Sequence, residues 1–229
     1  HAWGMTETSP IGSAAHLTPD LEDGSYDDQV AARKTQGLIV PGLEFEVLGD
    51  GDEPIDWDGE DFGELLIRGP WVTDEYYERP DANQTDFEGS WLRTGDIVTV
   101  DPEGYIEIVD RADDVIKSGG EWISSQELEN AIMAHDEVSE AAVIGVPHEK
   151  WGERPVAFVV PVEGADREAL VEGVAALVRE EYPDWWVPDA VEFIDAVPKT
   201  ATGKFSKKDL REEFADESLI EGAAPESRE

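Results

Sequence analysis

The 229-residue chain contains no cysteine and few basic residues, since Lys and Arg number 17 against 55 Asp and Glu. The absence of cysteine excludes disulfides, thiol catalysis and zinc–thiolate sites. The formal net charge of −38 argues against nucleic acid and anionic membranes as partners, because both are negatively charged. A signal peptide and long apolar runs are also lacking, so we expect a cytoplasmic protein with no segment that spans a membrane.

A charge this acidic also occurs in disordered chains, but eight Trp and clear apolar periodicity indicate a folded protein. We interpret the charge as a halophilic surface, on which carboxylates hold water and high salt screens their mutual repulsion. The length allows one large domain or two small ones. The chain opens at His1 within a motif-like stretch and without an initiator Met, so we expect the natural protein to be longer at its N-terminus.

Residues 109–123 divide the sequence into two parts. Two adjacent acids, one Arg, one Lys and a Gly pair stand here between apolar runs, which is typical of a joint followed by a tight hairpin. Before it, short alternating runs and turn signals over residues 37–109 predict a small β-barrel or sandwich. After it, strand and helix patterns alternate and predict a compact α+β unit, with helices capped at Ser124 and Asp166.

Two polar stretches in the first part contain candidate site residues. The Thr6 hydroxyl could bind a phosphate oxygen and the Glu7 carboxylate could hold Mg²⁺, although the stretch taken alone favours an ordinary polar turn. Asp96 follows a Thr-Gly pair at the expected entrance of a strand. Its carboxylate could accept hydrogen bonds from a sugar diol, and an ordinary turn aspartate is the alternative.

Basic residues gather in one segment near the C-terminus, which has a charge of +4 because its only acid is Asp209. A Lys on the Gly-containing turn there, Lys204, could reach a developing negative charge, and a solvated helix start is the alternative. The turn is not a phosphate-binding P-loop, because Pro198 stands where that motif needs Gly. The basic residues of the segment are Lys199, Lys204, Lys207, Lys208 and Arg211.

Four stretches, residues 3–8, 94–96, 110–121 and 198–204, resemble in this order the motifs of the adenylate-forming acyl-CoA synthetase superfamily. They are most similar to medium- and long-chain fatty acyl-CoA synthetases. The resemblance covers almost the whole chain and implies a mixed α+β or α/β fold. Residues 1–109 would be the end of a large AMP-binding domain with a small β-barrel subdomain. Residues 110–113 would be a hinge centred on Asp113, and residues 114–229 a small mobile C-terminal domain with an acidic tail.

The resemblance also implies an AMP-forming acid–thiol ligase that uses ATP, Mg²⁺ and CoA. A fatty carboxylic acid would react with ATP to give acyl-AMP and pyrophosphate, and the CoA thiol would then take the acyl group. By position, Trp3 would lie against adenine and Thr6 would bind phosphate. Asp96 and Arg111 would contact the ribose, and Glu7 would hold Mg²⁺.

The same resemblance gives roles to the second part of the chain. Lys204 would bridge the substrate carboxylate and the α-phosphate during adenylation, when two anions must approach each other. Lys117 would serve the thioester step, after rotation of the small domain about the hinge. Gly119 and Gly120 would line the pantetheine tunnel, where side chains would obstruct CoA.

The Ser/Thr/Gly-rich phosphate loop of the family and most of its acyl pocket are absent from the sequence, so we expect the chain alone not to complete catalysis. Two alternatives stay open. The same fold could activate an amino or aryl acid, as in a peptide-synthetase adenylation domain; a carrier domain would favour this reading, and the acidic tail after Lys204 does not. The chain could also be a non-catalytic fragment that binds only nucleotide or a partner. The sequence leaves acyl chain length and oligomeric state open, with a homodimer as one option.

Overall fold

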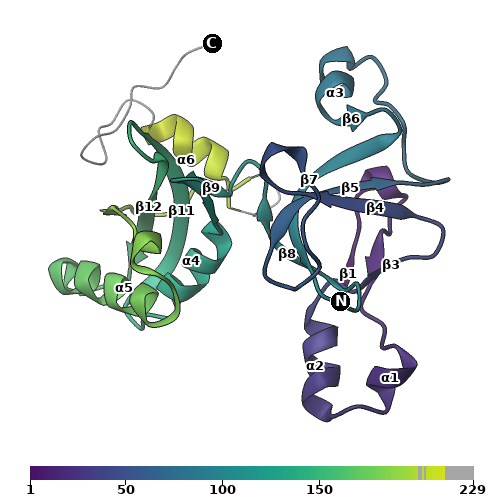
Figure 1. Cartoon of the computed structure of the whole chain (residues 1–229). Coiled ribbons are helices and arrows are strands. Elements are labelled where there is room, and N and C mark those ends of the chain that lie inside the picture. The colour runs from purple at the N-terminus through teal and green to yellow at the C-terminus, as the bar shows by residue number, and fades with distance from the viewer. Residues whose placement is uncertain (201–202, 204, 215–229) are drawn as a thin grey trace. The chain divides into compact units, whose positions relative to one another are not determined.

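The computed structural model describes residues 1–200, 203 and 205–214, and the chain divides into two compact units, His1–Asp113 and Asp114–Glu229 (Figure 1). Strands and helices mix in both units, which confirms the predicted fold class. Within the described residues, no helix has both the length and the apolar character needed to cross a membrane.

The first unit begins with a small antiparallel sheet of β1 (Ala2–Trp3), β2 (Ser13–Ala14) and β3 (Leu38–Ile39). A short 3₁₀ turn, Thr6–Thr8, lies between β1 and β2. Two helices, α1 (Pro19–Glu22) and α2 (Tyr26–Lys34), lie between β2 and β3. The two-residue strands were not predicted, because so short a strand carries no periodicity.

A larger antiparallel sheet forms the core of the first unit and curls into a half-barrel, which is the predicted β-subdomain (Figure 1). Its order is β4-β5-β7-β6, and β8 pairs with the other part of β7. Leu65, Ile67 and Val98 are among the side chains buried between its strands. The strands are β4 (Glu44–Leu48), β5 (Phe62–Arg68), β6 (Phe87–Glu88), β7 (Trp91–Val100) and β8 (Ile106–Arg111). A short helix, α3 (Pro80–Thr85), precedes β6.

The Thr-Gly-Asp stretch lies inside β7 and not at its entrance as predicted. The β5–β7 register jumps from Leu66↔Arg93 to Glu64↔Ile97, so three residues of β7 face one residue of β5. Gly95, within this irregularity, has φ +68°, which a glycine adopts without strain. Because such an irregularity bends a strand, it determines where the next side chain, Asp96, is directed.

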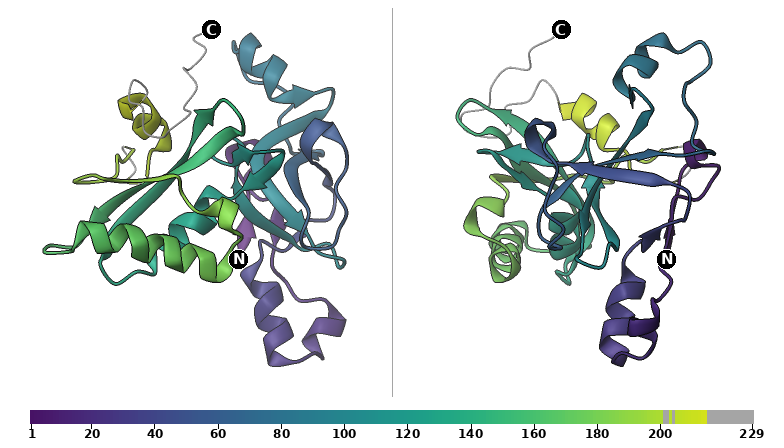
Figure 2. Two further views of the ribbon diagram at one scale, coloured as in Figure 1. Left: turned by 60° about the vertical axis from the view of Figure 1, so that its left-hand side comes forward. Right: turned by 45° about the vertical axis from the view of Figure 1, so that its right-hand side comes forward.

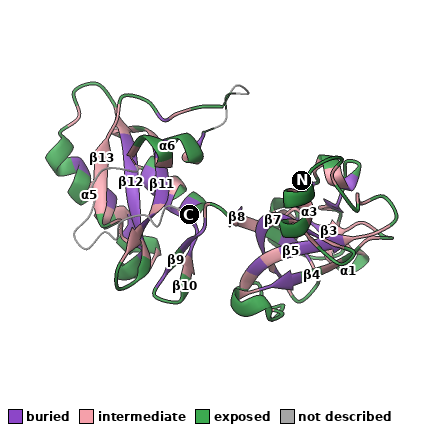
Figure 3. Cartoon of the chain, turned by 90° about the horizontal axis from the view of Figure 1, so that it is seen from above, coloured by how far each residue is buried: buried purple, intermediate pink, exposed green. Residues whose placement is uncertain are grey.

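The second unit is a five-stranded sheet covered by helices on both faces (Figure 2). The strand order is β10-β9-β12-β11, and β13 runs parallel to β12 after the α5 crossover. The two longest strands of this sheet, β11 and β12, contain long runs of buried residues (Figure 3). The strands are β9 (Ile116–Ser118), β10 (Glu121–Ile123), β11 (Val138–His148), β12 (Gly152–Pro161) and β13 (Ala190–Phe193).

One face of this sheet packs against α4 (Ser125–Met133) and α5 (Arg167–Glu181), and the other against α6 (Lys207–Phe214). Alternate residues of β12 supply the two cores, since Val159 belongs to the first and Phe158 to the second. Both predicted helix starts are confirmed. The Ser124 hydroxyl accepts from the Glu127 N–H, and the Asp166 carboxylate accepts from two N–H groups of the first turn of α5.

Candidate functional site

Three predicted nucleotide-binding residues meet at Asp96 in the first unit. The residue is 5% exposed, and its Oδ2 accepts the indole N–H of Trp3 at 2.8 Å. Its Oδ1 accepts from the guanidinium of Arg111, which β8 places directly opposite Asp96 on β7. The Thr94 hydroxyl supports the arrangement, because it accepts from the Asp96 N–H at 3.1 Å and donates to the Leu65 carbonyl at 2.7 Å.

A carboxylate offers about four acceptor positions, so two described donors leave Asp96 capacity for a further hydroxyl. Trp3 is 7% exposed and its indole belongs to the core of the first unit, with Gly12 against the ring. Its described polar contact is therefore with Asp96, and its stacking on adenine stays a prediction. Sequence spacing could not show this cluster, because the two residues are 93 positions apart.

Glu7 lies on the 3₁₀ turn after β1 and is bound at both its side chain and its main chain. The Tyr76 hydroxyl donates to Glu7 Oε1 at 3.0 Å, and the Thr73 N–H donates to the Glu7 carbonyl at 2.9 Å. Partial burial, followed by the hydrogen bond to Glu7, raises the pKa of Tyr76 to about 12. The neighbouring Thr6 is exposed, and its predicted phosphate contact stays a prediction.

A cavity of about 430 Å³ in the first unit brings several candidates to one place. Glu7, Arg111 and Asp113 all line it, together with Tyr76 and Arg93. Arg93 is ion-paired with Asp52 at 2.6 Å, Glu64 at 2.7 Å and Glu88 at 3.1 Å, so its charge is already shared among three carboxylates.

The described residues contain no group of three or more His, Asp or Glu side chains placed to hold a metal ion. Mg²⁺ commonly binds through one or two carboxylates, substrate phosphates and water, so a single carboxylate is enough when a nucleotide carries the ion. Glu7, which lines the cavity, fits that pattern.

The second unit contains the predicted glycine hairpin between β9 and β10. Gly119 and Gly120 have φ +67° and +93°, as the two central residues of a type I′ turn require. The Lys117 N–H donates to Glu153 Oε2 at 2.8 Å, and the Gly119 N–H donates to the Trp151 carbonyl at 2.7 Å. The exposed Lys117 ammonium lies 5.0 Å from the centroid of the Trp122 ring.

A second cavity, of about 360 Å³, lies beside Gly119 and was not predicted. The exposed rings of Trp151 and Trp185 line it, together with the buried Arg154. Arg154 donates to Ser118 Oγ at 3.1 Å and to Asp189 Oδ1 at 2.6 Å, and so ties β12 to β9. The sequence shows that both residues are Trp, but nothing in it shows that the two rings are exposed or that they share a cavity.

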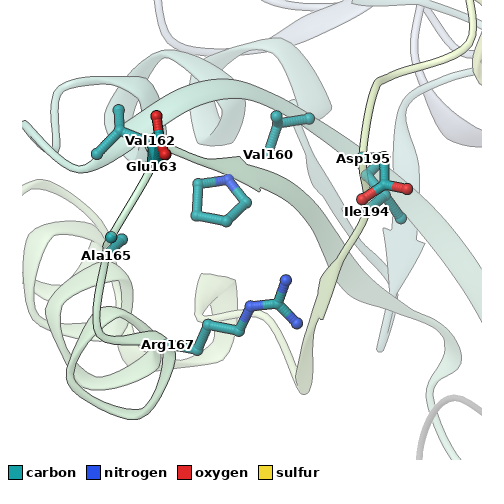
Figure 4. A pocket seen from close by; sticks show the side chains of 9 residues that line it. Val160, Val162, Glu163, Ala165, Arg167, Ile194 and Asp195 are labelled. Atoms are coloured by element: carbon teal, nitrogen blue, oxygen red, sulfur yellow. The ribbon is translucent and has the colours of Figure 1, made fainter.

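A third cavity, of about 270 Å³, lies where β12 ends, α5 begins and β13 ends (Figure 4). Arg167, Glu163 and Asp195 line it. None of the residues predicted from the sequence is among its lining residues, so we place no part of the site there.

The basic segment is largely paired with acids from other elements. Lys199 contacts Glu140 at 2.5 Å, Lys207 contacts Glu129 at 2.7 Å, and Arg211 contacts Asp114 at 2.8 Å. Lys204, the predicted adenylation lysine, lies outside the described residues. A β-bridge joins two described residues on either side of it, Lys199 and Phe205.

Comparison with protein families gives two matches at opposite ends of the chain. Residues 1–77 match the model of the AMP-binding enzyme, and residues 127–204 match that of the AMP-binding enzyme C-terminal domain. The chain belongs to the AMP-binding enzyme family. The family predicted from the four sequence motifs is thereby confirmed.

Several members of the AMP-binding family are similar over most of this chain. A 3-methylmercaptopropionyl-CoA ligase of Ruegeria lacuscaerulensis is 44% identical over 94% of the chain and 39% of its own length. A long-chain-fatty-acid–CoA ligase of Thermus thermophilus is 42% identical over 93% of the chain and 39% of its own length. The chain thus spans about two fifths of the length of these relatives.

Solved structures of the family agree with the fold. The amide bond synthetase McbA from Marinactinospora thermotolerans has a TM-score of 0.72 at 32% identity, over 93% of this chain and 41% of its own. The ATP-bound MatB from Rhodopseudomonas palustris has a TM-score of 0.73 at 29% identity, over 94% of this chain and 40% of its own.

Proposed function

We propose that this protein is an AMP-forming acid–thiol ligase, which activates a carboxylic acid with ATP and transfers the acyl group to CoA. The observation that carries the proposal is the buried Asp96 carboxylate, held by Trp3 and Arg111 beside the cavity that Glu7 lines. The relatives support a fatty or other aliphatic acid, since they include ligases of long-chain fatty acids, medium-chain fatty acids and 3-methylmercaptopropionate. They do not favour an amino acid substrate.

In the first step, a carboxylate oxygen of the acid attacks the α-phosphorus of ATP and pyrophosphate leaves. Asp96 and Arg111 would orient the ribose, and Thr6 would bind a phosphate oxygen. Bound Mg²⁺ would neutralise phosphate charge, and Glu7 would hold it. Lys204 would lie between the two reacting anions and offset their repulsion.

In the second step, the CoA sulfur attacks the acyl carbon, the thiol loses its proton and AMP leaves. Gly119 and Gly120 leave room for the pantetheine chain, because neither has a side chain. The cavity beside Gly119 would receive another part of CoA, since the rings of Trp151 and Trp185 offer faces on which adenine stacks. The chain divides directly after Asp113, so this residue would be the hinge about which the second unit moves between the two steps.

The test is pyrophosphate release with ATP, Mg²⁺ and acids from acetate to palmitate, using the natural full-length protein. We infer a halophilic, cytoplasmic enzyme from the −38 charge and from its substrates ATP and CoA, so the assay contains high salt. Acid-dependent release, with acyl-CoA formed when CoA is added, is expected. Release that yields an amide with amines but no thioester with CoA would contradict the thiol ligase and favour an activity like that of McbA.

Replacing Lys117 by Ala is expected to slow thioester formation about tenfold more than adenylation. The Lys117 ammonium is exposed on the glycine hairpin and would supply a positive charge for CoA. The hydrogen bond that holds β9 at this position comes from the main-chain N–H of Lys117, which the substitution keeps. The two half-reactions are measured separately, as pyrophosphate exchange and as acyl transfer from preformed acyl-AMP. Lys117→Arg keeps the charge and is the matched control. Equal losses in both half-reactions would remove this assignment.

A further inference from the structure

Tyr76 contacts the predicted metal ligand but has no role in the function proposed so far. Its hydroxyl donates to Glu7 Oε1 at 3.0 Å, although the two residues are 69 positions apart. Both side chains line the 430 Å³ cavity of the first unit. The contact is therefore at the edge of the site and not in the hydrophobic core.

Tyr76 is held at both its main chain and its ring. The Asn83 side chain accepts from the Tyr76 N–H at 2.7 Å and donates to the Tyr76 carbonyl at 3.0 Å, which fixes the main chain. The ring packs edge-on against Phe87, with 5.5 Å between ring centroids. Because Thr73 also binds the Glu7 carbonyl, residues 73–76 hold Glu7 at both its main chain and its carboxylate.

The Tyr76 hydroxyl that donates to Glu7 is a neutral group and not a cation. Glu64, another acid of the cavity, is paired with the Arg93 guanidinium at 2.7 Å, which offsets its charge. Glu7 instead receives a hydrogen bond from a phenol, so its negative charge stays available for a cation. One hydrogen bond at Oε1 leaves the second oxygen of the carboxylate to bind a ligand.

We propose that Tyr76 is a positioning residue that orients the Glu7 carboxylate to receive nucleotide-bound Mg²⁺. The inference rests on the proposed function, in which Glu7 is the metal ligand. Mg²⁺ demands near-octahedral geometry, and partners in the outer shell orient the groups that ligate it. A Glu side chain that is already held also loses less rotamer freedom when the ion binds.

The test compares Tyr76→Phe with Tyr77→Phe in the natural full-length protein. Tyr77 is the adjacent residue and is 87% exposed, so the same substitution there is a matched control. For Tyr76→Phe, the Mg²⁺ concentration that gives half-maximal pyrophosphate exchange is expected to rise about fivefold, as loss of one hydrogen bond predicts, with little change in the saturated rate. Tyr77→Phe should match the wild type.

Calorimetric binding of ATP, with and without Mg²⁺, gives a readout that does not depend on turnover. In Tyr76→Phe, ATP affinity without metal should equal that of the wild type, and the gain in affinity on adding Mg²⁺ should be smaller. In a Glu7→Gln background, Tyr76→Phe should have no further effect on that gain. A thermal unfolding curve confirms that each variant is folded.

Two results for Tyr76→Phe would overturn the proposal. One is a Mg²⁺ dependence for Tyr76→Phe equal to that of Tyr77→Phe, and the other is a fall in the saturated rate with no shift in Mg²⁺ dependence. If the wild type binds Mg²⁺ and ATP but activates no acid, the ligase proposal fails while the binding experiment still decides the role of Tyr76. If the wild type gains no ATP affinity from Mg²⁺, the proposal about Tyr76 fails as well.

Discussion

Lys204→Ala is expected to lower the rate of acyl-AMP formation by about 10²- to 10³-fold, with little loss of stability. The substrate carboxylate and the α-phosphate are both anions, and a Lys ammonium between them offsets their repulsion as they approach. Described residues close to Lys204 in the sequence contact each other, since Lys199 forms a β-bridge with Phe205 and the Gly203 N–H donates to the Thr200 carbonyl at 2.9 Å. The measurement is acid-dependent pyrophosphate exchange at saturating ATP, together with thermal unfolding.

The control for Lys204→Ala is Lys208→Ala. Lys208 is an exposed lysine of the same basic segment, 3.9 Å from Glu212, so its replacement removes one positive charge at nearly the same position in the sequence. In a chain of net charge −38, loss of any cation weakens the attraction for anionic substrates, and the control measures that general effect. Equal losses in the two variants, or an unchanged rate in Lys204→Ala, would contradict the bridging role.

Lys207→Met is expected to lower the free energy of unfolding of the second unit by about 3–5 kcal/mol, as for a buried ion pair that loses one partner. The Lys207 ammonium lies 2.7 Å from Glu129 Oε1, and the two side chains are only 10% and 13% exposed. It also donates to Ser125 Oγ at 2.6 Å, so it ties α6 to α4. The substitution would leave the Glu129 carboxylate nearly buried without this counterion. Urea unfolding at one fixed, high salt concentration measures the change.

The double variant Lys207→Met/Glu129→Gln separates loss of the pair from loss of packing. It removes both charges and retains an oxygen that can accept from the Val143 N–H, as Glu129 does at 2.9 Å. We expect it to recover most of the lost stability, because the nearly buried carboxylate charge is removed together with the lysine that offset it. Equal destabilisation in the single and double variants would show that the lysine acts through packing alone.

The long elements of this fold were predictable because each shows its own local pattern. Alternating apolar residues identified the strands around β5 and β12, and cap residues identified the starts of α4 and α5. The two-residue strands β1, β2 and β6 were missed because so short a segment shows no alternation and is defined only by its pairing with another strand. The Thr-Gly pair resembled a strand entrance, whereas β7 continues through it with a shift in its register against β5.

The candidate site was predictable by residue type but not by partner. The sequence indicated Asp96, Arg111 and Glu7, and the structure adds that Asp96 binds Arg111 and that Tyr76 binds Glu7. The positive charge of the C-terminal segment was visible in the sequence, but its partners Glu129 and Glu140 lie 78 and 59 positions away from the lysines they bind. Such contacts depend on tertiary packing, which no local pattern encodes.

Because of the ion pairs of Arg93, the first unit should tolerate loss of one of the paired acids better than loss of Arg93 itself. One guanidinium serves Asp52, Glu64 and Glu88, so losing any one acid leaves two partners for the cation. Losing Arg93 instead leaves three carboxylates facing one another, and like charges at such distances repel. The protein has 17 basic and 55 acidic residues. Substitution of one acid should therefore lower its stability little, whereas substitution of a cation that several acids share should lower it much more.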